Sequence, residues 1–187
     1  MKFIYFLFSI PHILCFIIYR NIIPDIKSDL IRFSGQKAQT KDFIIQMRKK
    51  EYRNVFYYRL PFILRHILNL ILRREQSCLL HTNSIGEGLL IQHGFSSIIV
   101  AQKIGKNFGF NQNVTVGWSK KGKPIIGDNV RIYTGAVVAG NIKIGNNVTI
   151  SANSVVTIDV PDNSFVIGNP CTIYKKKNET FNNNTSI

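Results

Sequence analysis

Cysteine and acidic residues are both scarce in this sequence. Its 187 residues include three cysteines, Cys15, Cys78 and Cys171, and none of them forms a CxxC pair. An odd number of isolated cysteines indicates neither a disulfide framework nor a zinc knuckle, and a reducing cytoplasm fits this pattern best. Only 10 Asp and Glu residues accompany 24 Lys and Arg residues, so the formal net charge is +14. This balance favours partners that carry phosphate, such as nucleic acid, an anionic membrane surface or a nucleotide-like cofactor.

Histidine is also scarce, and its distribution limits the chemistry of the chain. His12 and His66 lie in the apolar first half, and only His81 and His93 lie in the second half. A catalytic zinc site takes three protein ligands, so no metal is expected there. The sequence has no nucleic-acid-binding motif with interleaved aromatic residues. It therefore predicts no metal and no nucleic-acid partner.

An aliphatic or aromatic residue returns at every sixth position through the second half of the chain. The spacing is interrupted only by a seven-residue step to Ile98 and a ten-residue step from Val116 to Ile126. Glycine, asparagine and aspartate fill the places between these anchors, and they tolerate the left-handed backbone of repeated corners. The twelve anchors are Ile85, Ile91, Ile98, Ile104, Phe110, Val116, Ile126, Ile132, Val138, Ile144, Ile150 and Val156.

A six-residue step indicates one short strand followed by one corner, which is the unit of a parallel β-helix. Three such sides make a coil of about eighteen residues, so twelve anchors predict a mainly β domain of about four coils. Each anchor buried on the axis is expected to contribute about 1.5–3 kcal/mol. A β-sandwich is the alternative, but its strands recur at intervals of about 8–12 residues.

Three regions are predicted: a helical part at 1–80, the β-helix at 81–174 and a polar flexible tail at 175–187. Residues 3–19 are apolar but contain Pro11 and His12, and they fall short of the roughly 20 residues that a spanning helix needs. No small-x-small cleavage site follows them. A pair of buried helices is the first interpretation, contact with a membrane surface the second and a true membrane span the third.

The stretch 53–75 is apolar and basic, and Pro61 is placed to begin a helix of about fourteen residues. Such a helix either lies on an anionic membrane surface or packs between subunits while its arginines reach solvent. Both alternatives stay open, and the protein is expected in the cytoplasm, free or at the inner membrane surface. The arginines in question are Arg53, Arg59, Arg65, Arg73 and Arg74.

The repeat and the motifs at 88–94, 124–130 and 168–170 resemble the hexapeptide-repeat acyltransferases. The likeness is greatest to serine acetyltransferases and to related O-acetyltransferases of bacterial surface-polysaccharide pathways, and it covers residues 81–174. This resemblance implies a left-handed coil, acetyl-CoA as the acyl donor, and a homotrimer with active sites between neighbouring prisms.

The same resemblance implies roles for individual residues. His93, within Gln92-His93-Gly94, matches the catalytic histidine, which acts as general base in direct transfer to a hydroxyl. Gln92 and Lys123 match positions on the acceptor side. The positions that match the acetyl-CoA site are Thr134, Ala152, Thr157, Ile158, Lys175 and Lys176.

Two departures from the serine enzymes bear on the acceptor. Serine acetyltransferases have an aspartate before the catalytic histidine and an arginine–histidine pair before the loop proline, where this chain has Gln92 and Gly122-Lys123. The protruding loop at 118–123 therefore lacks the arginine that faces the amino-acid carboxylate in those enzymes, while Lys123 could still hold a carboxylate, either of serine or of an acidic sugar. The sequence predicts a sugar hydroxyl of a surface-polysaccharide precursor as acceptor. Serine O-acetylation in cysteine biosynthesis is the alternative, and a non-enzymatic basic membrane-surface scaffold is a more distant one.

Overall fold

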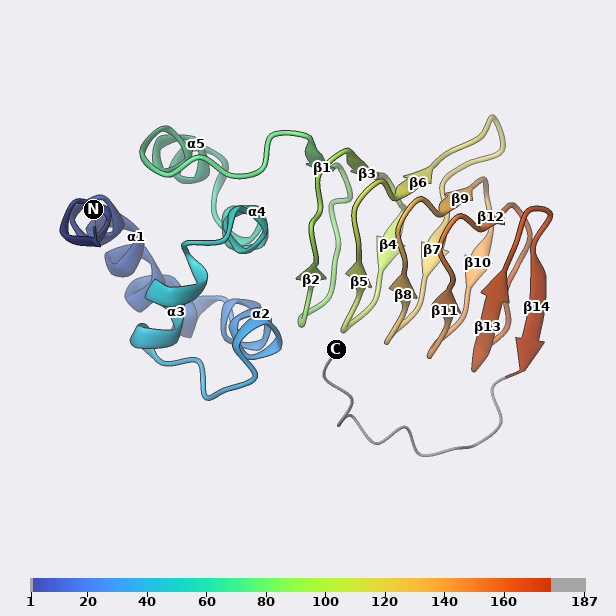
Figure 1. Cartoon of the computed structure of the whole chain (residues 1–187), viewed down its shortest axis with the longest axis horizontal. Helices are drawn as coiled ribbons and strands as arrows, with labels where there is room; N and C mark the ends of the chain where they lie inside the picture. The colour runs from blue at the N-terminus through green and yellow to red at the C-terminus, as the bar shows by residue number, and fades with distance from the viewer. Residues whose placement is uncertain (1, 176–187) are drawn as a thin grey trace.

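The computed structural model describes residues 2–175, with five helices gathered at one end and a coil of short strands at the other (Figure 1). The helices form a small bundle that covers the first turn of the coil, so the open end of its core is not left to solvent. Their bounds are α1 Lys2–Ile22, α2 Asp25–Ser34, α3 Thr40–Gln46, α4 Lys50–Arg59 and α5 Phe62–Ile71.

Helix α1 runs unbroken through Pro11, so the predicted pair of buried helices is wrong. Proline removes one helical hydrogen bond. Side chains bond to carbonyls beside the interruption: Ser9 Oγ donates to Tyr5 O at 2.8 Å, and His12 Nδ1 lies 3.2 Å from Phe8 O. Only a narrow stripe of α1, which includes Ser9, His12 and Phe16, is buried.

The exposed remainder of α1 is apolar. Within the described part of the chain, α1 alone has the length and composition that a membrane span requires, a property that core helices and signal sequences share. Only 17% of its Tyr5–Ile22 stretch is buried. The bundle therefore uses a minority of this helix for its own packing.

An aromatic cluster holds the bundle together. Phe16 stacks on Phe43 with ring centroids 4.3 Å apart, and Phe56 meets Phe43 edge-on at 4.9 Å. The basic stretch 53–75 is split between α4 and α5, and α5 has ten residues rather than about fourteen. Arg53 and Arg59 are buried within the protein, so the expectation that they reach a membrane surface or solvent is wrong.

Fourteen strands form the coil, and all of them pair in parallel except the terminal β13–β14 hairpin. Sheet A has the order β1-β3-β6-β9-β12, sheet B β10-β7-β4, and sheet C β14-β13-β11-β8-β5-β2. Sheet A marks five turns instead of the predicted four, because β1 precedes the first anchor. The strands are β1 Cys78–Leu80, β2 Leu90–Ile91, β3 Ser97–Ile99, β4 Lys103–Ile104, β5 Gly109–Phe110, β6 Thr115–Gly117, β7 Ile125–Ile126, β8 Arg131–Ile132, β9 Val137–Ala139, β10 Lys143–Ile144, β11 Thr149–Ile150, β12 Val155–Val156, β13 Ser164–Ile167 and β14 Thr172–Lys175.

Eleven of the twelve predicted anchors are buried and stack along the axis of the coil. The exception is Ile98, which is 42% exposed, while its neighbour Ile99 is fully buried. Side chains alternate between the two faces of a strand, and Ser97 and Ile99 occupy the inward positions of β3. The seven-residue step misplaced the anchor by one residue, and such a slip exchanges inside and outside.

The predicted corners are present and reinforce one another along the edge between sheets B and C. Asn107 Nδ2 donates to Asn129 Oδ1 at 2.9 Å, Asn129 to Asn147 at 3.0 Å, and Asn147 to Asn163 at 2.9 Å. All four asparagines have positive φ, a conformation that asparagine adopts more readily than most residues. This ladder keeps successive turns in register, and the register in turn positions the other two edges.

Candidate functional site

The edge between sheets C and A carries four of the predicted site residues. The corner after β2 contains Gln92 and His93, and the corners after β8 and β11 contain Thr134 and Ala152. Backbone bonds join successive corners, as from Gly135 N to Gln112 O at 3.2 Å and from Asn153 N to Thr134 O at 2.9 Å. We call this row of corners the His93 edge. It brings the predicted base and two predicted acetyl-CoA positions onto one line.

His93 projects from a tight, strained turn. Its φ is +54°, and Phe95 N donates to His93 O at 2.6 Å. The turn requires glycine at 94, because a Cβ there would lie 2.2 Å from Ile91 Cγ2. The His93 side chain is exposed, and its imidazole has no hydrogen-bond partner within residues 2–175. A histidine held this way by its backbone, with both ring nitrogens available, is suited to take a proton from a bound hydroxyl.

Arg131 stands beside this corner, although no motif in the sequence marks it as a site residue. From β8 its side chain crosses β5 and reaches the corner after β2, where Nη2 donates to Gln92 Oε1 and lies 3.3 Å from Asn111 Oδ1. Gly109 leaves the room for this crossing, because a Cβ there would lie 2.8 Å from Arg131 Nη1. In the sequence, the only indication of this contact is the register of the repeat, which places residue 109 beside residue 131 on adjacent turns of the coil.

The electrostatics around Arg131 favour an anion. Burial lowers the pKa of its guanidinium, the positive charge of Arg32 on α2 lowers it further, and Tyr133 opposes the shift. Arginine nevertheless stays protonated in proteins. Arg131 forms no ion pair with a carboxylate among the described residues, and its Nε is buried without a partner there. The result is an uncompensated positive charge next to the candidate base.

The other predicted residues lie elsewhere on the prism. Thr157 and Ile158 follow β12, at the edge between sheets A and B, and the loop at 118–123 leaves the same edge. Two reciprocal backbone bonds close that loop, from Ser119 N to Gly122 O at 3.0 Å and back at 3.1 Å. Lys123 follows the closure and is exposed. We call this row the Thr157 edge. Within one chain, the strands of sheet A separate it from the His93 edge.

The structure describes only one of the two predicted lysines near the C-terminus. Lys175 is the last residue of β14 and is exposed at the outer end of sheet C. Lys176 lies outside the described residues. Among residues 2–175, no three His, Cys, Asp or Glu side chains gather in a way that would hold a metal ion.

The fold is that of a β-helix built from hexapeptide repeats, and comparison with known proteins agrees. Residues 123–157 match the family described as bacterial transferase hexapeptide (six repeats). The chain is 50% identical over 97 residues to the serine acetyltransferase of Staphylococcus aureus strain Mu50, covering 49% of this chain and 46% of that protein. It is 40% identical over 126 residues to the serine acetyltransferase of Staphylococcus xylosus, covering 64% and 58%. The chain thus spans about half the length of the curated relatives it matches.

Solved structures extend this likeness to the helical half. Neisseria gonorrhoeae serine acetyltransferase in complex with serine superposes with a TM-score of 0.62 at 27% identity, over 82% of this chain and 69% of that one. Brucella melitensis serine O-acetyltransferase gives a TM-score of 0.68 at 21% identity, over 87% and 73%. The predicted left-handed parallel β-helix with N-terminal helices is confirmed, and the chain is serine acetyltransferase-like in sequence and in fold.

Proposed function

We propose that this protein transfers the acetyl group of acetyl-CoA to the hydroxyl of L-serine, with His93 as general base. The observation that carries the proposal is that the guanidinium of Arg131, which has no carboxylate partner among the described residues, contacts Gln92, the residue directly before His93. The likeness to serine acetyltransferases supports the reaction class, and a serine complex of a structural relative supports the acceptor.

The chemistry is a direct transfer. The His93 imidazole removes the acceptor's hydroxyl proton while the hydroxyl oxygen attacks the thioester carbonyl. The tetrahedral intermediate collapses with cleavage of the carbon–sulfur bond, and the imidazolium returns its proton to the departing CoA thiolate. In this proposal no covalent enzyme intermediate is needed, because the enzyme would hold the acceptor hydroxyl and the thioester side by side for direct attack. Backbone N–H groups of the corners are the candidate donors to the oxyanion.

The acceptor differs from the one expected from the sequence. That expectation rested on two missing countercharges, at Gln92 and Gly122, and the comparisons favour serine over a polysaccharide. Arg131 supplies a positive charge from a position 39 residues away from Gln92. A sugar hydroxyl stays the second candidate, because neutral Gln92 offers donor and acceptor groups suited to a glycan.

Mass spectrometry of acceptors after incubation with acetyl-CoA separates these candidates. L-serine, serinamide and a panel of neutral and acidic glycans are offered in parallel. Efficient acetylation of L-serine, with serinamide a poor acceptor, is the expected result. Acetylation of glycans with none of serine would return the assignment to the polysaccharide pathway. Acetylation of nothing, with acetyl-CoA left unbound, would favour the non-enzymatic scaffold.

We further propose a homotrimer in which the His93 edge of one chain faces the Thr157 edge of its neighbour. This arrangement would reunite His93 and Thr134 with Thr157, Ile158 and Lys123, which one chain keeps on separate edges. Acetyl-CoA would then lie between chains, with Lys175 as countercharge to its phosphates. Sedimentation equilibrium should give three times the chain mass of 21.3 kDa, and a monomer at micromolar concentration would contradict the proposal.

A cytoplasmic location accompanies this function. The three cysteines Cys15, Cys78 and Cys171 are free thiols in the structure, and burial raises the pKa of Cys78 to about 12, which keeps that thiol protonated and unreactive. Fractionation of cells that express the full chain, with and without a high-salt wash, tests the location and reports whether a part of the protein is held at the membrane.

A further inference from the structure

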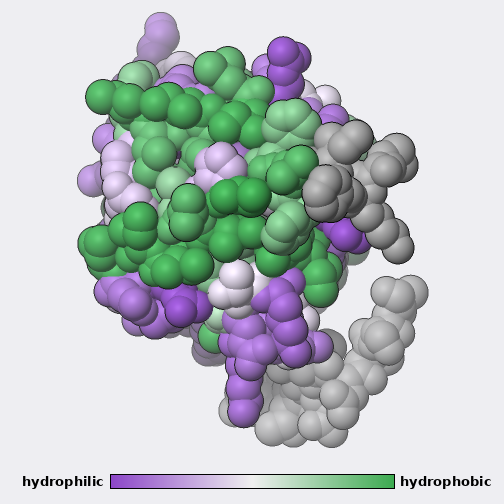
Figure 2. Space-filling view, turned by 90° about the vertical axis from the view of Figure 1, so that its left-hand side faces the viewer, coloured by the Kyte–Doolittle hydropathy of each residue, from purple (hydrophilic) through white to green (hydrophobic). Residues whose placement is uncertain are grey.

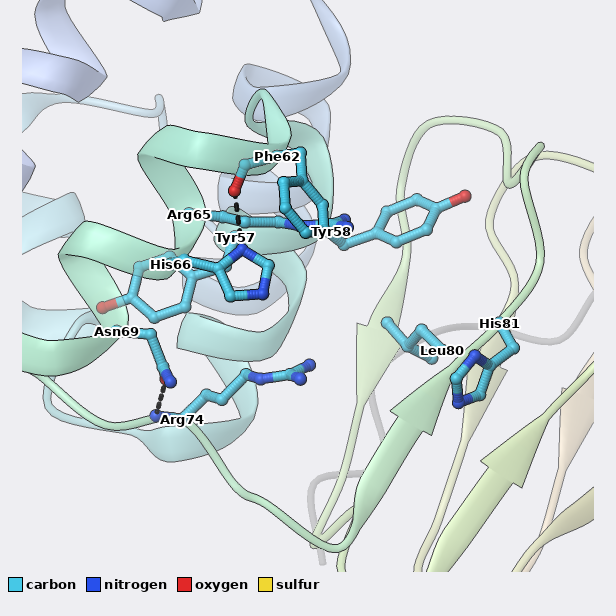
Figure 3. Close-up of a pocket in the computed structure, with 9 residues that line it drawn as sticks. All are labelled: Tyr57, Tyr58, Phe62, Arg65, His66, Asn69, Arg74, Leu80 and His81. Atoms are coloured by element: carbon cyan, nitrogen blue, oxygen red, sulfur yellow. Dashed lines mark hydrogen bonds between the residues drawn. The ribbon is translucent and has the colours of Figure 1, made fainter.

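A cavity of about 180 Å³ lies between α5 and β1, on the far side of sheet A from the His93 corner. Nine residues line it, among them two arginines and two histidines but no aspartate or glutamate. Figure 3 shows Arg74 extending from the segment after α5 towards β1, with His66 on the helix side and His81 on the strand side. A pocket that is rich in donors and poor in acceptors is complementary to an anion.

The contacts within this pocket leave its cations available. His66 Nδ1 lies 2.7 Å from Phe62 O, which leaves Nε2 for another partner. The Arg65 guanidinium sits 5.0 Å from the centre of the Phe62 ring, and no carboxylate pairs with Arg65 or Arg74 among residues 2–175. Arg74 is held through its backbone, whose N–H donates to Asn69 Oδ1 at 3.0 Å. The loop is thereby fixed while the guanidinium is not.

An exposed apolar face adjoins the pocket. Phe62 lines the cavity and is 66% exposed, and further along α5 the side chains of Ile63, Ile67 and Leu70 are also exposed. Figure 2 shows this end of the molecule, where hydrophobic side chains cover most of the surface and hydrophilic ones border it below. Helix α1, which contacts α5, adds the exposed side chains of Phe6, Leu7, Phe8, Ile10, Leu14, Ile17, Ile18 and Ile22.

We propose that this end of the protein docks on a bilayer containing anionic phospholipid, with a phosphate headgroup in the α5–β1 pocket and the apolar side chains of α5 and α1 in the acyl region. The charge pattern favours a lipid surface over a second copy of the chain. Two copies meeting through the same face would bring like-charged arginines together, whereas anionic headgroups compensate them. Soluble proteins rarely leave so large an apolar patch without a partner.

This inference does not depend on acetyl transfer, so its test uses binding alone. The full chain is co-sedimented with vesicles of phosphatidylcholine, with and without phosphatidylglycerol. Binding is expected only with phosphatidylglycerol, and it should weaken as salt is raised. The double variant Arg65→Gln/Arg74→Gln should lower the vesicle affinity by about fivefold for each arginine.

Matched controls separate a headgroup site from general attraction. Lys103→Gln/Lys143→Gln removes the same charge from exposed positions on sheet B and should change binding little. Ile67→Ser/Leu70→Ser should also lose binding, and thermal unfolding shows whether each variant remains folded.

Equal losses of vesicle affinity in both charge variants would overturn the assignment of a headgroup to the α5–β1 pocket. Sedimentation velocity showing larger species that Ile67→Ser/Leu70→Ser disperses, without any vesicle binding, would assign the face to a second copy. Binding of inorganic phosphate without vesicle binding would also overturn the membrane proposal.

Discussion

Arg59 on α4 and Asp29 on α2 form a buried ion pair in which Arg59 Nε donates to Asp29 Oδ2 at 2.7 Å, with 6% and 2% of the two side chains exposed. The same guanidinium donates to Ile85 O at 2.6 Å and to Gly86 O at 2.7 Å, while Asp29 Oδ1 accepts from Leu89 N at 2.8 Å. This pair therefore ties the helical bundle to the first turn of the β-helix. Burial raises the pKa of Asp29 to about 6, although Arg59 and the Leu89 amide oppose that shift.

Replacing Asp29 by Asn should destabilise the protein by about 3–5 kcal/mol, because it removes the only buried carboxylate that pairs with Arg59 among the described residues and leaves the half-exposed Asp25 as its one counterion. Urea unfolding followed by circular dichroism, at a pH well above 6 where Asp29 is ionised, measures the loss. Asp25→Asn is the matched control: Asp25 meets the same guanidinium at 3.0 Å but is 38% exposed. Its loss should stay below about 1 kcal/mol. Equal losses from the two variants would contradict the role given to Asp29.

His12 should make the stability of the helical bundle depend on pH. Its Nε2 lies 2.8 Å from Tyr57 Oη, and burial lowers the pKa of its imidazole. The folded state therefore disfavours the proton, so this contribution is present above the unfolded pKa of about 6.5 and is lost as pH falls below it, with a limiting slope of about 1.4 kcal/mol per pH unit. Unfolding measured from pH 8 down to pH 5 should show a slope that His12→Gln reduces. Ser9→Ala removes a neighbouring buried side chain that does not titrate, and it should lower stability while leaving the slope unchanged.

The sequence predicted the repeat well because its signal is local. Each anchor such as Ile132 or Ile150 sits at a fixed spacing from the next, and parallel register follows from that spacing alone. The prediction of a buried anchor was wrong at Ile98, because the extra residue in the seven-residue step shifted the inward positions of β3 by one. The exposure of His93 was likewise predictable, since it follows an anchor and begins a corner.

The remaining features depend on contacts that are distant in sequence. Arg131 reaches Gln92 across 39 residues only because Gly109 of an intervening turn lacks a side chain. From the sequence alone Arg59 is expected on the surface, and only the fold brings Asp29 beside it as a buried partner. Pro11 argued for a break in α1, but side-chain bonds to carbonyls on the preceding turn accompany an unbroken helix. In each of these cases, contacts made in the folded structure decided the outcome, and the local sequence pattern does not reveal them.

His93→Ala should reduce the turnover number by about 10²–10⁴, the usual effect of a lost general base, while leaving the β-helix folded. The exposed side chain makes no contact whose loss would unfold the corner. Release of CoA thiol from acetyl-CoA in the presence of L-serine measures the rate, and circular dichroism checks the fold. His81→Ala, which removes an exposed histidine at the end of β1, is the control and should keep the wild-type rate. Turnover that is equally fast in His93→Ala would exclude the base assignment.

Arg131→Gln should raise the KM for L-serine by about 10- to 100-fold, since a charge-assisted bond contributes about 1.5–3 kcal/mol. The KM for acetyl-CoA and the weak activity with serinamide should not change, because neither depends on the acceptor carboxylate. Arg131→Lys keeps the charge and should recover part of the affinity, though without the planar guanidinium the recovery is incomplete. A rise in KM that is the same for serine and serinamide would make Arg131 a structural residue only.

Gly109→Ala offers a finer test, because it keeps the charge of Arg131 and moves it. A Cβ at position 109 would lie 2.8 Å from Arg131 Nη1 and 3.1 Å from its Cδ. The flexible side chain can yield where a backbone could not, so the protein should be as stable as the wild type or gain about 0.5 kcal/mol from replacing glycine within a strand. The displaced guanidinium should nevertheless leave Gln92, and the KM for L-serine should rise by a smaller factor than in Arg131→Gln. Gly117→Ala is the matched control in β6, where the nearest atom to a new Cβ is Thr115 Cγ2 at 3.9 Å. Steady-state kinetics beside thermal unfolding decides the matter: an unchanged KM in Gly109→Ala would mean that the exact placement of Arg131 does not set acceptor affinity.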